Sequence, residues 1–193
     1  VDFWNMRGGK RLPKLPDTGA RAWDTRVSAA LNDPRRMLFP VRGLYIDALE
    51  RATESIYITS AYFIPDRVIA KALLDAAARD VDIKVLVPEK SNHVIADWVS
   101  RAYITDLLDA GVELWLYQDV MIHAKTAVVD GRWVTVGTAN IDRLSMTGNY
   151  EVNLQVHDPE MARHMEEIFR ADLTNSRLVD PDEWRQRPLV QRA

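Results

Sequence analysis

Residues 123–140 have the sequence HAKTAVVDGRWVTVGTAN, and this stretch decides the fold of the chain. The apolar run 121–129 predicts a β-strand, and side chains two residues apart on a strand leave the same face. We therefore expect His123 and Lys125 to lie side by side. Asp130-Gly131 is a two-residue hairpin signal, so the chain should turn back through residues 132–136 and bring Asn140 to the level of His123.

These side chains together suit the chemistry of a phosphate ester. An imidazole can act as nucleophile, an ammonium is a fixed cation, and an amide is a neutral donor. A single histidine on a strand is more often a packing residue than a catalyst. The fixed spacing of His123 to Lys125, Asp130 and Asn140 favours catalysis.

Outward from the hairpin, strands alternate with helices, which predicts an α/β fold with a mixed, mostly parallel sheet flanked by helices. Strands are expected at about 56–60, 83–87, 112–117 and 151–157, and helices at about 44–52, 94–109 and 159–172. A further helix is expected after Asp66, with apolar residues up to Ala76 on one face. Residues 1–40 are punctuated by glycine and proline and are expected to be a linker, residues 41–174 the catalytic domain, and residues 175–193 a tail.

Composition narrows the classes of function. The chain has 193 residues, 47% of them hydrophobic, which is enough for one core. A net charge of −3 gives no overall basic field, so nucleic acid is an unlikely partner. The absence of cysteine excludes disulfides, and no sequence motif for a metal or nucleotide is present, so no cofactor and no metal are expected. No apolar run approaches the ~20 residues of a membrane-spanning helix.

The 123–140 stretch resembles the HKD signature of the phospholipase D superfamily. Two further segments, 60–66 (SAYFIPD) and 149–153 (NYEVN), resemble bacterial cardiolipin synthases, most closely the C-terminal half. The resemblance implies a phospholipase D-like fold with a catalytic hairpin. One departure is Leu144, which stands where many members carry arginine.

The resemblance also implies roles for single residues. His123 would be the nucleophile that forms a phosphohistidine, or the general acid. Lys125 and Asn140 would bind phosphate, and Asp130 would be the structural member of the catalytic set. Glu151 would bond the second ring nitrogen of the histidine. The substrate-binding candidates that complete the site are Thr138, Asn149, Tyr62, Phe63 and His93.

Chemistry of this kind needs two histidines, one to attack phosphorus and one to protonate the leaving alkoxide, but the chain holds one HKD motif. Either two copies form a homodimer, or the chain is one half of a two-motif enzyme; we expect the second. The expected reaction moves a phosphatidyl group between phosphatidylglycerol molecules, at the cytoplasmic side of the bacterial inner membrane in peripheral contact. A phospholipase D-type phosphodiesterase, a dimeric nuclease and a non-catalytic interaction half are the alternatives.

Overall fold

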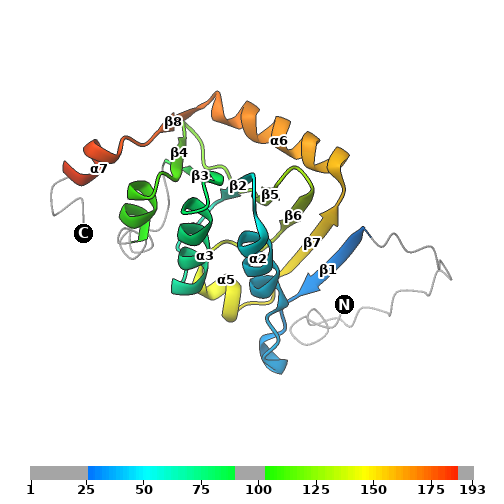
Figure 1. Cartoon of the computed structure of the whole chain (residues 1–193). Coiled ribbons are helices and arrows are strands. Elements are labelled where there is room, and N and C mark those ends of the chain that lie inside the picture. The colour runs from blue at the N-terminus through cyan, green and yellow to red at the C-terminus, as the bar shows by residue number, and fades with distance from the viewer. Residues whose placement is uncertain (1–25, 90–102, 187–193) are drawn as a thin grey trace.

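The computed structural model describes residues 26–89 and 103–186. These residues form one eight-stranded sheet with helices on both faces (Figure 1). The strands are β1 (Val27–Leu31), β2 (Ser55–Ser60), β3 (Asp82–Pro88), β4 (Glu113–Tyr117), β5 (Lys125–Val129), β6 (Trp133–Gly137), β7 (Val152–His157) and β8 (Ser176–Leu178). The helices are α2 (Pro40–Arg51), α3 (Arg67–Ala77), α5 (Arg143–Thr147), α6 (Pro159–Leu173) and α7 (Pro181–Gln186), with a short 3-10 helix, η1 (Pro34–Arg36), before α2. Residues 103–109 are also helical.

The sheet has the strand order β1-β7-β6-β5-β2-β3-β4-β8. It is mixed, as the sequence predicts, but only β2–β3 and β3–β4 are parallel pairs, and the other five pairs are antiparallel. The expectation of a mostly parallel sheet is corrected on this point. The cause is the hairpin β5–β6, because β7 and then β1 continue its antiparallel pairing on the side away from β2.

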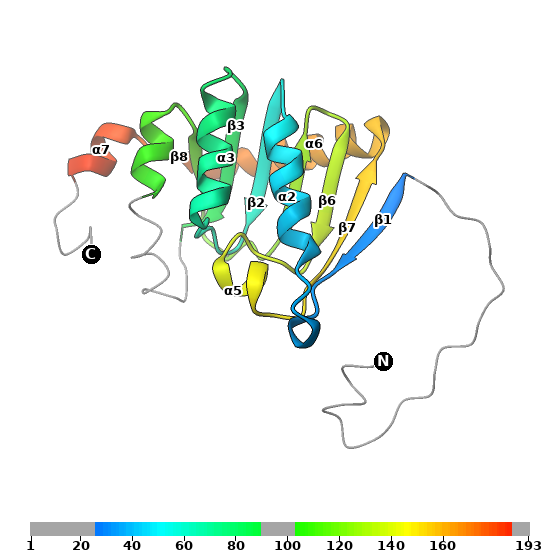
Figure 2. The ribbon, with the colours of Figure 1, turned by 60° about the horizontal axis from the view of Figure 1, so that its bottom comes forward.

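Helices α2 and α3 cover one face of the sheet and α6 covers part of the other (Figure 2). Helix α3 begins where Asp66 caps the backbone N–H groups of Val68 and Ile69. Its buried side chains recur at the helical spacing expected from the sequence: Ile69, Ala72, Leu73 and Ala76. Helix α6 is capped in the same way by Asp158, which accepts from the backbone of Met161.

The larger core lies between the sheet and helices α2 and α3. Ile56 and Ile58 of β2 are fully buried there, and Val85 of β3 and Val129 of β5 lie against them. A smaller core under α6 contains Val128, Val134 and Ala162. Burial of these branched and aliphatic side chains is the main stabilising term for such a layered fold.

The hairpin turn forms as the sequence predicts. Asp130 and Gly131 both have positive φ angles, of 51° and 57°, which is the conformation of a type I′ turn. The N–H of Arg132 donates to the carbonyl of Val129 at 3.1 Å. The last strand pair before the turn is Val129 with Trp133, so Arg132 has no partner in β5. The loop therefore has three residues, one more than the two-residue hairpin that was expected.

The sheet extends beyond the expected domain range 41–174 at both ends of the chain. Strand β1 pairs with β7 and strand β8 with β4. Residues 103–109 are helical and confirm the end of the helix expected at 94–109. The earlier part of that helix lies outside the described residues, and so do residues 1–25 and 187–193. Strand β5 starts at Lys125, four residues later than expected.

Candidate active site

Four strand ends meet at one end of the sheet and carry the site. Ser60 at the end of β2 is paired with Lys125 at the start of β5. Gly137 at the end of β6 is paired with Asn153 in β7. Because antiparallel neighbours end where their partners begin, the segments that follow β2 and β6 lie beside those that precede β5 and β7. This register brings residues far apart in the sequence to one surface.

His123 and Lys125 are in direct contact, which confirms the expected side-by-side arrangement. The Nζ atom of Lys125 lies 3.1 Å from Nδ1 of His123 and donates to the His123 carbonyl oxygen at 2.9 Å. Lys125 is 8% exposed, whereas the His123 side chain is exposed. The contact is not made between two strand residues, because His123 precedes the start of β5. A reactive ring at the surface is therefore backed by a buried cation.

Carboxylates near Lys125 keep it a cation in this partly dry position. Burial lowers the pKa of Lys125 below the ordinary value for lysine, and the negative charges of Glu151 and Asp142 oppose that shift. Both carboxylates come from segments that follow the hairpin. An anionic phosphate would enter a site in which its main cation is already held in place.

Glu151 is the most firmly positioned acid in the site. It is 8% exposed, and its two oxygens accept from the Thr138 hydroxyl and, at 3.4 Å, from the amide of Asn149. The expected bond from Glu151 to the imidazole of His123 is not formed, since Lys125 occupies Nδ1 instead. An ammonium group has only donors, so Nδ1 of His123 is the acceptor where this contact is a hydrogen bond.

Thr138 and Asn149 were expected to bind substrate, but both side chains hold Glu151 here. The Thr138 hydroxyl has a single hydrogen, which goes to Glu151, and its oxygen accepts from the N–H of Val152 at 3.0 Å. It therefore has no hydrogen left for a phosphate oxygen. These two residues position the acid.

Replacing Glu151 with glutamine is expected to lower the pKa of Lys125 further, because one of the two carboxylates that oppose the effect of burial is removed. The amide still accepts from Thr138, so the fold should persist. The pKa can be measured by NMR of ¹³C-methylated lysines across a pH titration. Glu167→Gln, a change to an exposed acid on α6, should leave the Lys125 titration in place; an unmoved titration in Glu151→Gln would contradict the coupling.

Asn140 has an unusual side chain. Its Oδ1 atom is buried and has no hydrogen-bond partner among the described residues. Its neighbours are fixed: the N–H of Ala139 donates to Asn153 at 3.3 Å, and the N–H of Ile141 donates to the Ser60 hydroxyl at 3.3 Å. Buried polar groups are nearly always paired, and this carbonyl oxygen could accept only from a donor that enters the site, such as a hydroxyl. A contact from Asn140 to a phosphate oxygen would have to come from its Nδ2 atom, which carries the amide hydrogens.

Three supporting residues were not among the expected site residues. Ser60 joins the β2 end to Ile141, Asp142 caps α5 and acts on Lys125, and Asn153 holds Ala139. Asn153 is fully buried and also donates to Thr135 at 3.1 Å. The sequence signal for Asn153 was a polar residue in a β-strand, two positions after Glu151 and hence on the same face.

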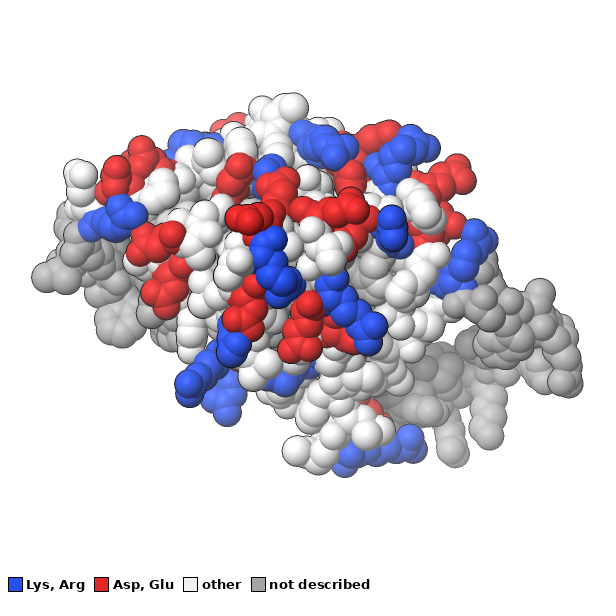
Figure 3. Space-filling view, in the orientation of Figure 1, with Lys and Arg blue, Asp and Glu red and all other residues white. Residues whose placement is uncertain are grey.

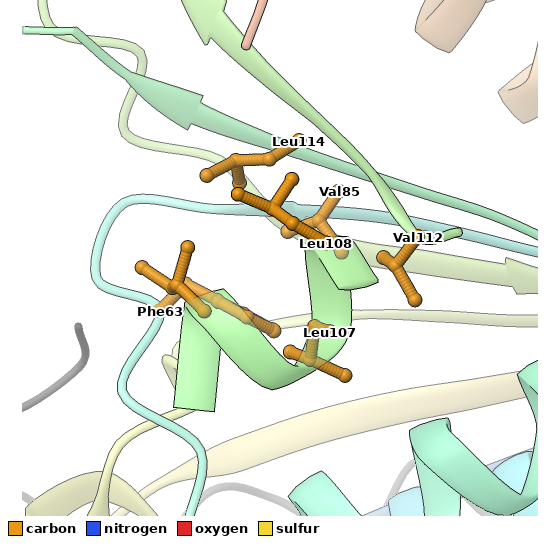
Figure 4. Close-up of a pocket in the computed structure, with 7 residues that line it drawn as sticks. Phe63, Val85, Leu107, Leu108, Val112 and Leu114 are labelled. Atoms are coloured by element: carbon orange, nitrogen blue, oxygen red, sulfur yellow. The ribbon is translucent and has the colours of Figure 1, made fainter. Parts of the chain in front are cut away.

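The side chains of Tyr62 and Phe63 lie in different surroundings. The Tyr62 ring meets the His123 ring edge-on, with centroids 6.4 Å apart. Phe63 is buried and lines a small apolar pocket under residues 103–109 (Figure 4). All of the residues that line this pocket are apolar, so it offers no bond to a head group. Phe63 is a packing residue, and His93 lies outside the described residues.

Asp130 is not brought together with the other four expected catalytic residues. It follows β5 at the end opposite Lys125, roughly 16 Å away at the usual rise of ~3.3 Å per strand residue. Its carboxylate accepts from the N–H groups of Thr53, Glu54 and Ser55, at 2.9, 2.8 and 3.0 Å, and from the Thr53 hydroxyl. Its role is to fix the start of β2 against the hairpin.

Replacing Asp130 with asparagine is expected to lower the free energy of unfolding by ~1–3 kcal/mol at pH 7, because the N–H donors lose a charged acceptor. Burial raises the pKa of Asp130, but the bonds from Ser55, Glu54 and Thr53 lower it more, so the net pKa is below its usual value of 3.8. A lowered folded-state pKa stabilises above about pH 4 and loses this effect as the pH falls further.

Urea unfolding at pH 7 and near pH 3 measures this effect, and the difference between wild type and Asp130→Asn should shrink at the lower pH. Asp75→Asn, at an exposed ion pair on α3, should change little at either pH. An equal difference for Asp130→Asn at both pH values would argue against a charged anchor.

Across residues 26–89 and 103–186, no three acidic, histidine or cysteine side chains are grouped closely enough to hold a metal ion. In the same residues, no helix has both the length and the apolar character needed to cross a bilayer.

A family model described as a cardiolipin synthase, phospholipase D-like domain matches residues 45–173. The chain belongs to this phospholipase D-like family. The major cardiolipin synthase ClsA of Bacillus subtilis (strain 168) is 40% identical over 175 residues, which cover 91% of the chain and 36% of the relative. Cardiolipin synthase A of Pectobacterium carotovorum (strain PC1) is 30% identical over 98% of the chain and 40% of the relative. The chain thus spans about two fifths of these phospholipase D-like relatives.

Solved structures agree with the phospholipase D-like fold. Nuc of Salmonella typhimurium, a phospholipase D family member, superposes with a TM-score of 0.68 at 25% identity, over 79% of the chain and 98% of Nuc. The phosphatidylserine synthase of Haemophilus influenzae Rd KW20 has a TM-score of 0.69 at 13% identity, over 86% of the chain and 43% of that protein. The second likeness concerns the fold alone.

Proposed function

We propose that the chain is the phosphatidyl-transferring half of a cardiolipin synthase-like enzyme. The observation that carries this proposal is the contact between the exposed His123 ring and the buried Lys125, with Glu151 held beside them. A nucleophile, a cation and an acid are the parts that a phosphodiester exchange requires. The 40% identity to a cardiolipin synthase over 91% of the chain supports the lipid assignment.

The reaction balances without a cofactor. An imidazole nitrogen of His123 attacks the phosphorus of phosphatidylglycerol, the P–O bond to glycerol breaks, and glycerol leaves with a proton from a second histidine. The hydroxyl of another phosphatidylglycerol then gives its proton to the second histidine and attacks the phosphohistidine; the N–P bond breaks, which gives cardiolipin and restores both histidines. With the roles exchanged, His123 is the acid and the second histidine attacks.

Phosphate binding would change the hydrogen bonds of the ring. A non-bridging oxygen attracts the Lys125 ammonium more strongly than a neutral ring nitrogen does, so Lys125 leaves Nδ1. Nδ1 can then carry the proton and donate it to Glu151, which frees the lone pair of Nε2 for attack. The bond that was expected between Glu151 and His123 therefore belongs to the substrate-bound state, and Asn140 receives the remaining phosphate contact.

The second histidine comes from another half-domain, which we place in the same longer polypeptide because the relatives are about two and a half times the length matched. The likeness to Nuc covers 98% of that chain, which favours the alternative in which two identical chains each supply one histidine. A nuclease would need a basic groove, and the net charge of −3 does not favour one. We further propose that the enzyme works at the cytoplasmic face of the inner membrane in peripheral contact.

A chimera tests the function. This chain replaces the matching segment of the Bacillus subtilis relative, and the purified chimera is given labelled phosphatidylglycerol. We expect cardiolipin and glycerol as products, and a label retained on His123 or on the partner histidine after rapid acid-free quenching. Release of phosphatidic acid alone would make the half a hydrolase, and a folded chimera that cleaves oligonucleotides but not lipid would overturn the proposal.

A further inference from the structure

We propose that the 33–38 loop, together with Leu31 and Leu144, forms a lipid-docking patch that places the active site against an anionic phospholipid surface. The proposal rests on the proposed function and adds the surface by which the chain meets its substrate. The basic residues Arg7, Lys10, Arg11 and Lys14 lie outside the described residues and are not part of this patch.

The patch holds four of the five most exposed large apolar side chains in the described residues; the fifth, Val120, is 63% exposed and lies in the segment before β5. Met37 is 76% exposed, Leu144 65%, Leu31 60% and Leu38 53%. Single exposed apolar residues are common on soluble proteins, but a group of them at one end of a molecule marks an interaction surface. Their segments are neighbours: Leu31 precedes Asn32, whose amide donates to the carbonyl of Ser145, the residue after Leu144, and the 33–38 loop follows Asn32 directly.

The 33–38 loop is a closed structure. Asp33 and Leu38 exchange backbone hydrogen bonds at 2.8 and 3.1 Å, and the Asp33 carboxylate accepts from the N–H of Arg35 at 3.0 Å. Met37 has a φ angle of 54°, a left-handed conformation that costs a non-glycine residue about 1 kcal/mol. These bonds hold the loop in a conformation that leaves Met37 and Leu38 in solvent.

Positive charge accompanies the apolar side chains. The loop contains Arg35 and Arg36 with Asp33 as its one acid, and Arg143 precedes Leu144. The Arg36 pair with Asp33 is long, at 3.6 Å, and its guanidinium is exposed. Figure 3 shows blue side chains beside uncharged surface at the lower tip, and Figure 1, in the same orientation, shows that the chain enters α2 there. Apolar groups flanked by arginine match an anionic bilayer interface, in which acyl chains lie under phosphate groups.

The patch is tied directly to the active site through Asn32. Asn32 is fully buried; its N–H donates to the carbonyl of Glu151 at 2.8 Å and its amide donates to the carbonyl of Ser145 at 3.0 Å. Its side-chain oxygen accepts from Val41 at the start of α2. Figure 2 shows the loop and α5 at the same end of the sheet. Asn32 therefore joins the backbone at Glu151 to α5, which carries Leu144, and to the start of the 33–38 loop.

Vesicle sedimentation of the 193-residue chain tests the proposal. The vesicles are phosphatidylcholine alone and about equal parts of phosphatidylglycerol and phosphatidylcholine. Met37→Ser with Leu38→Ser is expected to weaken partitioning onto the anionic vesicles ~10-fold or more, because the groups that enter the acyl region are lost. Arg35→Gln with Arg36→Gln should also weaken partitioning onto the anionic vesicles. Raising the salt concentration should then lower the partitioning of this variant less than that of wild type.

Matched controls come from other faces. Val68→Ser on α3 and Ile168→Ser on α6 remove apolar groups that are 44% and 42% exposed, and they should partition as wild type does. His123→Ala should also bind vesicles normally, because docking does not use the chemistry. All variants should unfold at the same urea concentration as wild type, which would show that the substitutions change the surface and not the stability of the fold.

Three results would overturn the proposal. The loop variant could bind vesicles as wild type does, or Lys10→Gln with Arg11→Gln could account for all of the binding. The loop variant could instead lose self-association by light scattering while its vesicle binding is unchanged, which would make the patch a protein interface. Cardiolipin formation by the chimera is scored separately, so a failure of the patch and a failure of the proposed function give different results.

Discussion

Replacing His123 with alanine is expected to lower turnover of the complete assembly by ~10³-fold or more, with the fold intact. The ring is exposed, and in the described part of the chain its side-chain contacts are with Lys125 and Tyr62, so its loss should leave no cavity in the core. The reaction, in contrast, loses either its nucleophile or its acid, because each of these two roles is filled by a single histidine.

The rate is measured in the chimera as cardiolipin formed per minute, beside unfolding by urea. His164→Ala is the matched control, because His164 is an exposed ring on α6 and should be replaceable without effect. A turnover near that of wild type in His123→Ala would remove this residue from both proposed roles.

Replacing Gly137 with alanine is expected to destabilise the fold by about 3 kcal/mol or more, the upper part of the range for overpacked sites. A Cβ atom there would lie 2.3 Å from Oδ1 of Asn153 and 2.4 Å from the carbonyl oxygen of Val152. The carbonyl belongs to the paired strand and cannot rotate away. Asn153 would have to move, and with it the support of Ala139 beside Asn140.

Gly43 provides the comparison. It lies within α2 with no atom within 4 Å of an added Cβ, so Gly43→Ala should stabilise the protein by up to ~1 kcal/mol through helix propensity. Urea midpoints of the two variants should move in opposite directions. An unchanged midpoint for Gly137→Ala would mean that β6 and β7 separate more easily than their register implies.

The central part of the fold could be predicted because its signals are local. Asp130-Gly131 predicts a turn with two residues in the left-handed conformation, and both have positive φ angles. The spacing of apolar residues after Asp66 predicts the buried face of α3. The neighbouring positions of His123 and Lys125 also follow from their separation of two residues.

What failed depended on contacts between distant segments. The residue types of β1 and β8 give no hint of their partners, so the antiparallel character of the sheet was underestimated. Asp130 was expected to be structural, and its carboxylate does bond the backbone at the start of β2; what the sequence did not show is that it lies at the end of β5 opposite Lys125.

Side-chain partners were the least predictable feature of the site. Thr138 and Asn149 are polar groups near a strand end, which fits substrate binding as well as it fits support of Glu151. Tyr62 and Phe63 are adjacent in the sequence, and only the structure shows that Tyr62 faces His123 while Phe63 enters the core.

The pairing of β1 with β7 also bears on how this protein is kept soluble. A chain shortened to start at residue 41, where the sequence pattern becomes regular, would leave the backbone of β7 with unpaired N–H and C=O groups. Val152 and Leu154 already present exposed apolar side chains on that strand. An open strand of this kind is a template for pairing between molecules, and β1 replaces it with a shorter edge strand of five residues in place of the six of β7.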